Sequence, residues 1–179
     1  MFSIRDLRTW TATLGPREFR RQVGPFVLIQ HPPDPVLQQL AMTMGAQRTL
    51  GSNSRDNLID DLMLMIRGFD DLVVCTLPPL GASADLTVGR LPDCELVIED
   101  PSVSKRHAML RWDTVQGGCS IQDLGSMNGT FVNAKELEKG EERLLADGDA
   151  LAFGDPEFLY FVTDSLYQQL AGKGLAKKE

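Results

Sequence analysis

The hydrophobic pattern of the chain changes near residue 72, and this change constrains the fold more than any other feature. From there to residue 162 the sequence consists of short segments rich in β-branched and aromatic residues, each bounded by Gly, Pro, Asp or Asn. No helical spacing separates these segments, which is typical of a β-sandwich. We therefore predict strands at 73–77, 86–88, 95–98, 108–112, 119–123, 130–132, 150–153 and 158–162.

The first third of the chain has a helical period instead. Ile4, Leu7, Trp10 and Leu14 recur at three- and four-residue intervals, which places them on one face of a helix. Residues 24–30 form an apolar run that is either a strand or an extended segment that docks a partner. Further helices are expected at 36–44, 55–69 and 165–170.

These patterns predict three parts. Residues 1–70 form a mostly helical N-terminal region, whose sequence resembles no family that we recognise. Residues 71–165 form the β-sandwich domain. Residues 166–179 form the end of a helix and a flexible, Lys-rich tail.

The composition narrows the class of protein. Hydrophobic residues make up 42% of the 179 residues and charged residues 24%, as in ordinary globular proteins. The three cysteines are widely separated and the two histidines lack metal-ligand spacing, so neither a disulfide framework nor a zinc site is expected. The N-terminus lacks a secretory pattern and the apolar runs are too short to span a bilayer, so we expect a cytoplasmic protein without membrane contact.

Charge argues against a nucleic-acid partner. Residues 84–164 contain 7 Lys and Arg against 16 Asp and Glu. Such an acidic segment repels nucleic-acid phosphates unless a strong basic patch offsets it, and the sequence contains no such patch.

Three motifs lie between the predicted strands, in a fixed order: Gly89-Arg90, Ser104-Lys105-Arg106-His107 and Asn128-Gly129. Together with their flanking residues they resemble the signature of the forkhead-associated (FHA) domain family, and a bacterial member is expected. The resemblance covers roughly residues 70–165. It implies an FHA-like β-sandwich of about eleven short strands that binds phosphothreonine.

The chemistry of the motif residues fits that ligand. A phosphate ester is held well by an arginine fork and by hydroxyl donors, which Arg90 and Ser104 supply. The resemblance further implies that Lys105 lies beside the phosphothreonine and that Asn128 reaches the main chain of the peptide. The other interpretation of Arg90 is a surface ion pair with Asp100 or Asp123.

The remaining signature residues are expected to be architectural. Gly89 leaves room for the backbone, and Gly129 adopts a positive φ. His107 is expected to brace the loop that carries Ser104 and not to act in catalysis.

The sequence departs from the family pattern at two positions. Met127 stands where the family often has a threonine whose hydroxyl supports the phosphate site, and Ser126 is the candidate to replace that hydroxyl. Lys105 replaces a frequent arginine, which keeps the charge but loses the planar fork. The predicted phosphopeptide site therefore comprises Arg90, Ser104, Lys105, Ser126, Met127 and Asn128.

The leading functional hypothesis is an adaptor in Ser/Thr kinase signalling that docks onto a phosphothreonine-containing protein or peptide, with a Ser/Thr kinase as one candidate partner. The alternative is a phosphate-independent scaffold or assembly subunit that uses the FHA fold and the N-terminal helices, with self-association through the N-terminal region as one form of it. An enzyme is disfavoured because the sequence has no Gly-rich nucleotide loop or nucleophile elbow, and neither catalytic residues nor a cofactor is expected.

A further hypothesis joins the two halves of the chain. If a kinase modified Thr9, Thr11 or Thr13, the resulting phosphothreonine would fold back onto Arg90 and close the site. The other interpretation is that all three are ordinary threonines on a helix surface.

Overall fold

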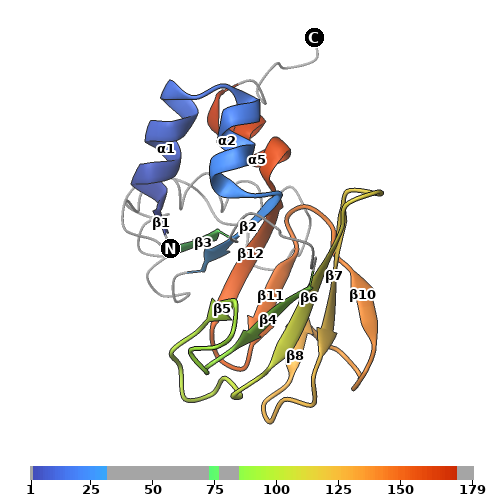
Figure 1. The fold of residues 1–179 in the computed structure, drawn as a ribbon. Coiled ribbons are helices and arrows are strands. Elements are labelled where there is room, and N and C mark those ends of the chain that lie inside the picture. The colour runs from blue at the N-terminus through green and yellow to red at the C-terminus, as the bar shows by residue number, and fades with distance from the viewer. Residues whose placement is uncertain (1, 32–72, 77–84, 173–179) are drawn as a thin grey trace, which may run out of the picture.

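Two β-sheets pack face to face, and helices cover the outer face of one of them (Figure 1). The computed structural model describes residues 2–31, 73–76 and 85–172. The helices predicted at 36–44 and 55–69, and the tail after residue 172, lie outside the described residues.

The larger sheet has seven strands in the order β1-β3-β2-β12-β11-β8-β9. Each pair of neighbours in it is antiparallel. Its strands are β1 (Phe2–Ser3), β3 (Val73–Thr76), β2 (Phe26–Gln30), β12 (Glu157–Val162), β11 (Ala150–Phe153), β8 (Thr130–Val132) and β9 (Lys135–Glu136).

The smaller sheet has five strands in the order β10-β7-β6-β4-β5. Its neighbours are antiparallel except for β4 and β5, which are parallel. Its strands are β10 (Glu142–Leu144), β7 (Gly118–Asp123), β6 (Ala108–Asp113), β4 (Asp85–Gly89) and β5 (Leu96–Val97).

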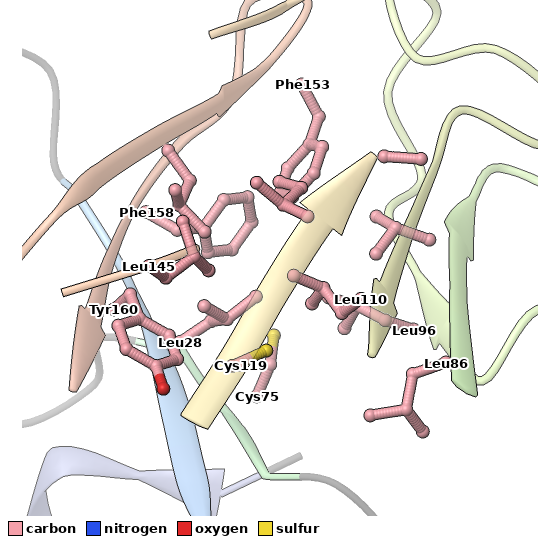
Figure 2. Packing of buried hydrophobic residues seen from close by; sticks show 14 of the residues in the cluster. Leu28, Cys75, Leu86, Leu96, Leu110, Cys119, Leu145, Phe153, Phe158 and Tyr160 are labelled. Atoms are coloured by element: carbon pink, nitrogen blue, oxygen red, sulfur yellow. The ribbon is translucent and has the colours of Figure 1, made fainter. Parts of the chain in front are cut away.

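The main core lies between the sheets. In β6 the buried residues Ala108, Leu110 and Trp112 alternate with more exposed ones, as expected for a strand with one face on a core. Leu110 and Cys119 of the smaller sheet belong to the same buried cluster as Phe158 and Tyr160 of the larger one (Figure 2). The predicted mainly-β sandwich is therefore confirmed.

Each of the eight predicted strand segments overlaps an observed strand. Strands β9 and β10 were not predicted. They are short and rich in charge, with the sequences Lys-Glu and Glu-Arg-Leu, and no residue in either is buried. They therefore show no hydrophobic alternation, because neither has a face on the core.

The apolar run that opens with Gly24-Pro25 contains a strand, β2. This strand pairs with β12 on one side and β3 on the other. Phe26 and Leu28 join the core between the sheets, whereas Val27 and Ile29 join a second core on the outer face. Burial on both faces explains why the run is continuously apolar.

This strand lies before the domain boundary predicted at residue 70. It nevertheless pairs in the middle of the larger sheet, far from either edge strand. The division into 1–70, 71–165 and 166–179 stays a prediction, but the larger sheet draws strands from both sides of its first boundary.

Among the described residues, three helices form a layer over the outer face of the larger sheet: α1 (Ile4–Thr13), α2 (Pro16–Val23) and α5 (Thr163–Leu170). A capping box between Ser3 and Asp6 starts α1, and Pro16 occupies the first turn of α2. The helices and the sheet share a second core in which ten residues are buried: Ile4, Leu7, Phe19, Val23, Val27, Ile29, Val74, Leu159, Phe161 and Leu166. The N-terminal helices are thus packed on the sandwich.

The three cysteines are free and buried. Burial raises the pKa of the Cys75 thiol to about 11 and that of Cys119 to about 12, which disfavours the reactive thiolate. Within the described part of the chain, every helix is too short or too polar to cross a bilayer.

Candidate functional site

The three motifs converge at one end of the sandwich. Val88 pairs with Ala108, and Ala108 pairs with Asp123, so the end of β4, the start of β6 and the end of β7 lie side by side. The loops after β4 (90–95), before β6 (98–107) and after β7 (124–129) therefore meet at this end. In Figure 1 they lie at the bottom of the molecule, opposite the helices.

His107 holds two of these loops together. Its imidazole is fully buried, Nδ1 accepts a hydrogen bond of 3.0 Å from the Ser104 N–H, and Nε2 lies 3.0 Å from the Gly129 carbonyl oxygen. Since that carbonyl only accepts, Nε2 carries the proton and the ring is neutral. Burial lowers the pKa of His107, although the Gly129 hydrogen bond and Asp123 oppose this effect. The geometry is what a bracing role requires.

Gly89 allows the loops after β4 and before β6 to touch. A Cβ atom at this position would lie 2.3 Å from the Lys105 carbonyl oxygen and 3.0 Å from the Arg106 Cα, so no side chain fits. The backbone N–H of Arg90 donates to the Ser104 carbonyl at 3.0 Å. Arg90 and Ser104 therefore lie next to each other although they are fourteen positions apart in the sequence.

The guanidinium of Arg90 is exposed and makes no ion pair or hydrogen bond with any described residue. The two carboxylates considered as alternative partners bond elsewhere. Asp100 accepts hydrogen bonds from Ser102, and Asp123 accepts them from Ser126 and from Thr130 at the start of β8. Lys105 is also exposed, and its backbone carbonyl accepts a hydrogen bond of 3.2 Å from the Leu91 N–H in the loop after β4. The site thus presents two cations toward solvent.

Ser104 lies at the junction of two loops and is half-buried. Its Oγ accepts a hydrogen bond of 3.0 Å from the Met127 backbone N–H. Because the oxygen acts as an acceptor there, the hydroxyl proton remains available to donate to an anion.

Asp123 organises the loop after β7. Its carboxylate accepts hydrogen bonds from the Gly125 and Ser126 N–H groups, and from the hydroxyls of Ser126 and Thr130 at 2.6 Å each. Burial raises the pKa of Asp123, but these hydrogen bonds outweigh burial and leave the pKa below its usual value.

The hydrogen bonds of Asp123 decide whether Ser126 replaces the threonine hydroxyl that is absent at Met127. The Ser126 hydroxyl donates to Asp123 and is therefore not free to donate to a phosphate. The Met127 side chain is 89% exposed, so it projects from the loop without a polar function. Of the serine hydroxyls in the three site loops, that of Ser104 is the one that does not donate to another described residue.

Asn128 lies at the tip of the same loop and is exposed. Its Nδ2 donates a hydrogen bond of 2.7 Å to the Ser102 carbonyl oxygen. The next residue, Gly129, has a φ of +82°, which lets the chain turn back into β8.

Two residues of this end were not predicted from the motifs. Asp123 and Ser102 organise the loops that carry Asn128 and Ser104. The Asp-Leu-Gly-Ser stretch at 123–126 offers a signal for Asp123, because Asp often caps a turn by accepting backbone N–H bonds two and three residues ahead. Ser102 bonds locally to Asp100, but its contact with Asn128 spans 26 positions and has no local signal in the sequence.

Comparison with known proteins gives the same family. Residues 86–154 match the model of the FHA domain. The chain is 38% identical over 69 residues to the glycogen accumulation regulator GarA of Mycolicibacterium smegmatis, which covers 38% of this chain and 40% of that protein. It is also 38% identical over 89 residues to a Dictyostelium discoideum protein named "Probable serine/threonine-protein kinase fhkA", covering 42% of this chain and 15% of that protein.

One solved structure, described as an analysis of phosphothreonine-dependent FHA domain interactions, is 31% identical and aligns with a TM-score of 0.43. The match covers 50% of this chain and 84% of that chain. The chain spans 40% or less of the length of the two curated relatives. Because residues 86–154 match the FHA domain model, this part of the chain belongs to the FHA domain family.

Proposed function

We propose that the loops at this end of the sandwich bind a phosphothreonine in an extended peptide. The observation that carries the proposal is the pairing of Arg90 with Ser104. A guanidinium without a described partner and a hydroxyl with a free proton lie on backbone segments that are hydrogen-bonded to each other. Such donors suit a dianionic phosphate, and Lys105 adds a second positive charge. Met127 and Ser126 frame the site without donating to the phosphate.

We further propose that the protein is an adaptor in Ser/Thr kinase signalling, whose partner is a phosphorylated protein in the cytoplasm. The names of the relatives support this role, since one is a regulator and another is named as a Ser/Thr kinase. In the second of these, the similarity covers 15% of the protein. The comparison therefore supports docking and gives no support to kinase activity in this chain.

The described helices give little support to the alternative of a scaffold that self-associates through them. The apolar residues Ile4, Leu7 and Phe19 are fully buried against the larger sheet. They are therefore not available to a second copy.

Self-docking of a phosphothreonine from α1 is also less favoured than a ligand from another protein. Thr9, Thr11 and Thr13 lie within α1, and each hydroxyl donates to a backbone carbonyl four residues earlier. Helix α1 lies at the end of the molecule opposite the loop after β4, the loop that begins with Arg90 (Figure 1). One of these threonines would reach the site in an extended conformation only after α1 unfolded.

A peptide titration tests the proposal. Fluorescence anisotropy with a library-selected phosphothreonine peptide and its unphosphorylated twin is expected to give binding only with phosphate. Arg90→Ala is expected to weaken binding roughly 10- to 100-fold, because hydrogen bonds to charged groups contribute about 1.5–3 kcal/mol. Arg17→Ala is the control, since Arg17 is also an exposed arginine but lies on α2. Equal affinity for both peptides, or equal effects of the two substitutions, would refute phosphate recognition by Arg90.

A further inference from the structure

The amide of Asn128 has a defined orientation even without a ligand. Its neighbour at 2.7 Å is the Ser102 carbonyl oxygen, which can only accept. The atom that faces Ser102 is therefore Nδ2, and Oδ1 points away from it. Among the described residues, Oδ1 has no hydrogen-bond donor. Asn128 thus offers an open acceptor at the tip of the loop after β7.

Ser102 is itself held in place by Asp100. The Oδ1 of Asp100 accepts hydrogen bonds from the Ser102 N–H at 2.8 Å and from the Ser102 hydroxyl at 2.6 Å. The same hydroxyl oxygen accepts a hydrogen bond of 2.9 Å from the Asp155 N–H. Ser102 thereby joins its own loop to the turn between β11 and β12.

The turn between β11 and β12 also packs closely on Ser102. A Cβ atom on Gly154 would lie 2.8 Å from both the carbonyl oxygen and the Oγ of Ser102. The Gly154 N–H donates a hydrogen bond to the carbonyl of Gly129, the residue that follows Asn128. Three loops therefore meet at Ser102, and its carbonyl has little freedom to move.

We propose that Asp100 and Ser102 are positioning residues that hold the Asn128 amide with Oδ1 toward the ligand, where it accepts a hydrogen bond from a main-chain N–H of the bound peptide. This inference rests on the proposed function. Ser102 acts through Asn128, because its hydroxyl already donates to Asp100 and accepts from Asp155. Asp100 and Ser102 do not contact the phosphate, which is bound by Arg90 and Ser104 in this proposal.

The orientation sets the kind of group that the peptide must present. An acceptor on Asn128 requires a donor on the ligand, and each peptide unit has one N–H. We expect that N–H to be contributed by one residue near the phosphothreonine. A peptide in which proline or an ester replaces that N–H is expected to be rejected.

Substitutions in the protein provide the first test. Asp100→Ala and Ser102→Ala are each expected to weaken phosphopeptide binding about 3- to 10-fold, the effect of losing one ordinary hydrogen bond. Asp100→Asn is expected to bind within about 2-fold of the unaltered protein, since its carbonyl oxygen can accept the same two hydrogen bonds. Glu99→Ala is the matched control, because it removes the same charge from the exposed neighbouring residue.

A double-mutant cycle separates positioning from general loosening of the fold. In an Asn128→Ala background, Asp100→Ala is expected to have no further effect on affinity, because the group that it orients is gone. Additive losses in the double variant, or affinity unchanged by Asp100→Ala alone, would overturn the proposal.

An ester scan of the peptide provides a test that needs no change in the Asp100 loop. Each amide of the phosphothreonine peptide is replaced in turn by an ester, which removes one N–H. One position is expected to lose about 3- to 10-fold in affinity for the unaltered protein and to lose nothing further with Asn128→Ala. If every ester has the same effect on both proteins, Asn128 does not accept from the peptide.

The two proposals fail in different ways. If the unaltered protein binds phosphorylated and unphosphorylated peptides equally, phosphate recognition fails. If it discriminates between them and loses affinity with Arg90→Ala, while the cycle and the ester scan show no coupling to Asn128, the positioning role alone fails.

Discussion

The hairpin between β8 and β9 contains an alanine in a conformation that suits glycine. Val132 pairs with Lys135, so Asn133 and Ala134 form a two-residue loop, and their φ angles are +51° and +62°. Such a turn prefers Asn-Gly, because both central residues have positive φ. Asn133 tolerates this conformation and also hydrogen-bonds to Asp149 and Ala150. Ala134 is exposed, so its methyl group buries no surface that would offset the strain.

Ala134→Gly is therefore expected to stabilise the protein. The left-handed conformation costs a residue with a Cβ about 1–2 kcal/mol, which glycine avoids. Glycine in turn adds about 0.4–1 kcal/mol of unfolded-state entropy that folding must overcome. The net expected gain is about 0.5–1 kcal/mol in the free energy of unfolding, or roughly 1–4 °C in Tm for a chain of this size.

Urea unfolding followed by circular dichroism measures this gain as a higher midpoint at constant slope. Ala12→Gly is the matched control, because Ala12 is also exposed but lies in α1. There glycine is expected to lower stability by about 1 kcal/mol. If both substitutions destabilise the protein to a similar extent, backbone strain at Ala134 is refuted.

Three further outcomes follow from the packing and the site. Burial lowers the pKa of His107, so on acidification the imidazole is protonated in the unfolded chain before it is protonated in the folded one. The free energy of unfolding is therefore expected to fall between about pH 7 and pH 5, and to fall less in the His107→Gln variant. Urea unfolding at a series of pH values measures this difference. Gly89→Ala places a methyl group 2.3 Å from the Lys105 carbonyl, so phosphopeptide titration is expected to show lost binding. Phe19→Ala removes a fully buried side chain between α2 and the sheet, and urea unfolding is expected to show a loss of about 3–5 kcal/mol; a loss below about 1 kcal/mol would mean that the helices are not integral to the fold.

Much of the sandwich was predictable because its signals are local. Alternating apolar residues, as in β6, record which face of a strand is buried, and Gly or Asp between segments records where the chain turns. The motif residues Gly89, Ser104 and Asn128 also lie between the predicted strands, in the order and spacing of the FHA signature. The fold class and the loops of the candidate site could therefore be predicted from the sequence.

Strands β9 and β10 could not be predicted in this way. They have no buried face, and they are strands because β8 and β7 offer them backbone partners. The role of Phe26–Gln30 was similarly ambiguous between a strand and a docking segment. Its pairing with β12 joins residues more than 120 positions apart, which no local pattern encodes.

The same distinction applies within the site. The sequence by itself determined which side chains stand in the loops, including Met127 in place of a hydroxyl. Only the tertiary structure decided that the Met127 N–H donates to Ser104, that Arg90 lies beside Ser104, and that the Asn128 acceptor points away from Ser102. The physical reason is that propensity and periodicity depend on neighbours in the chain, whereas a polar group bonds to the partner that folding brings to it, however distant in sequence.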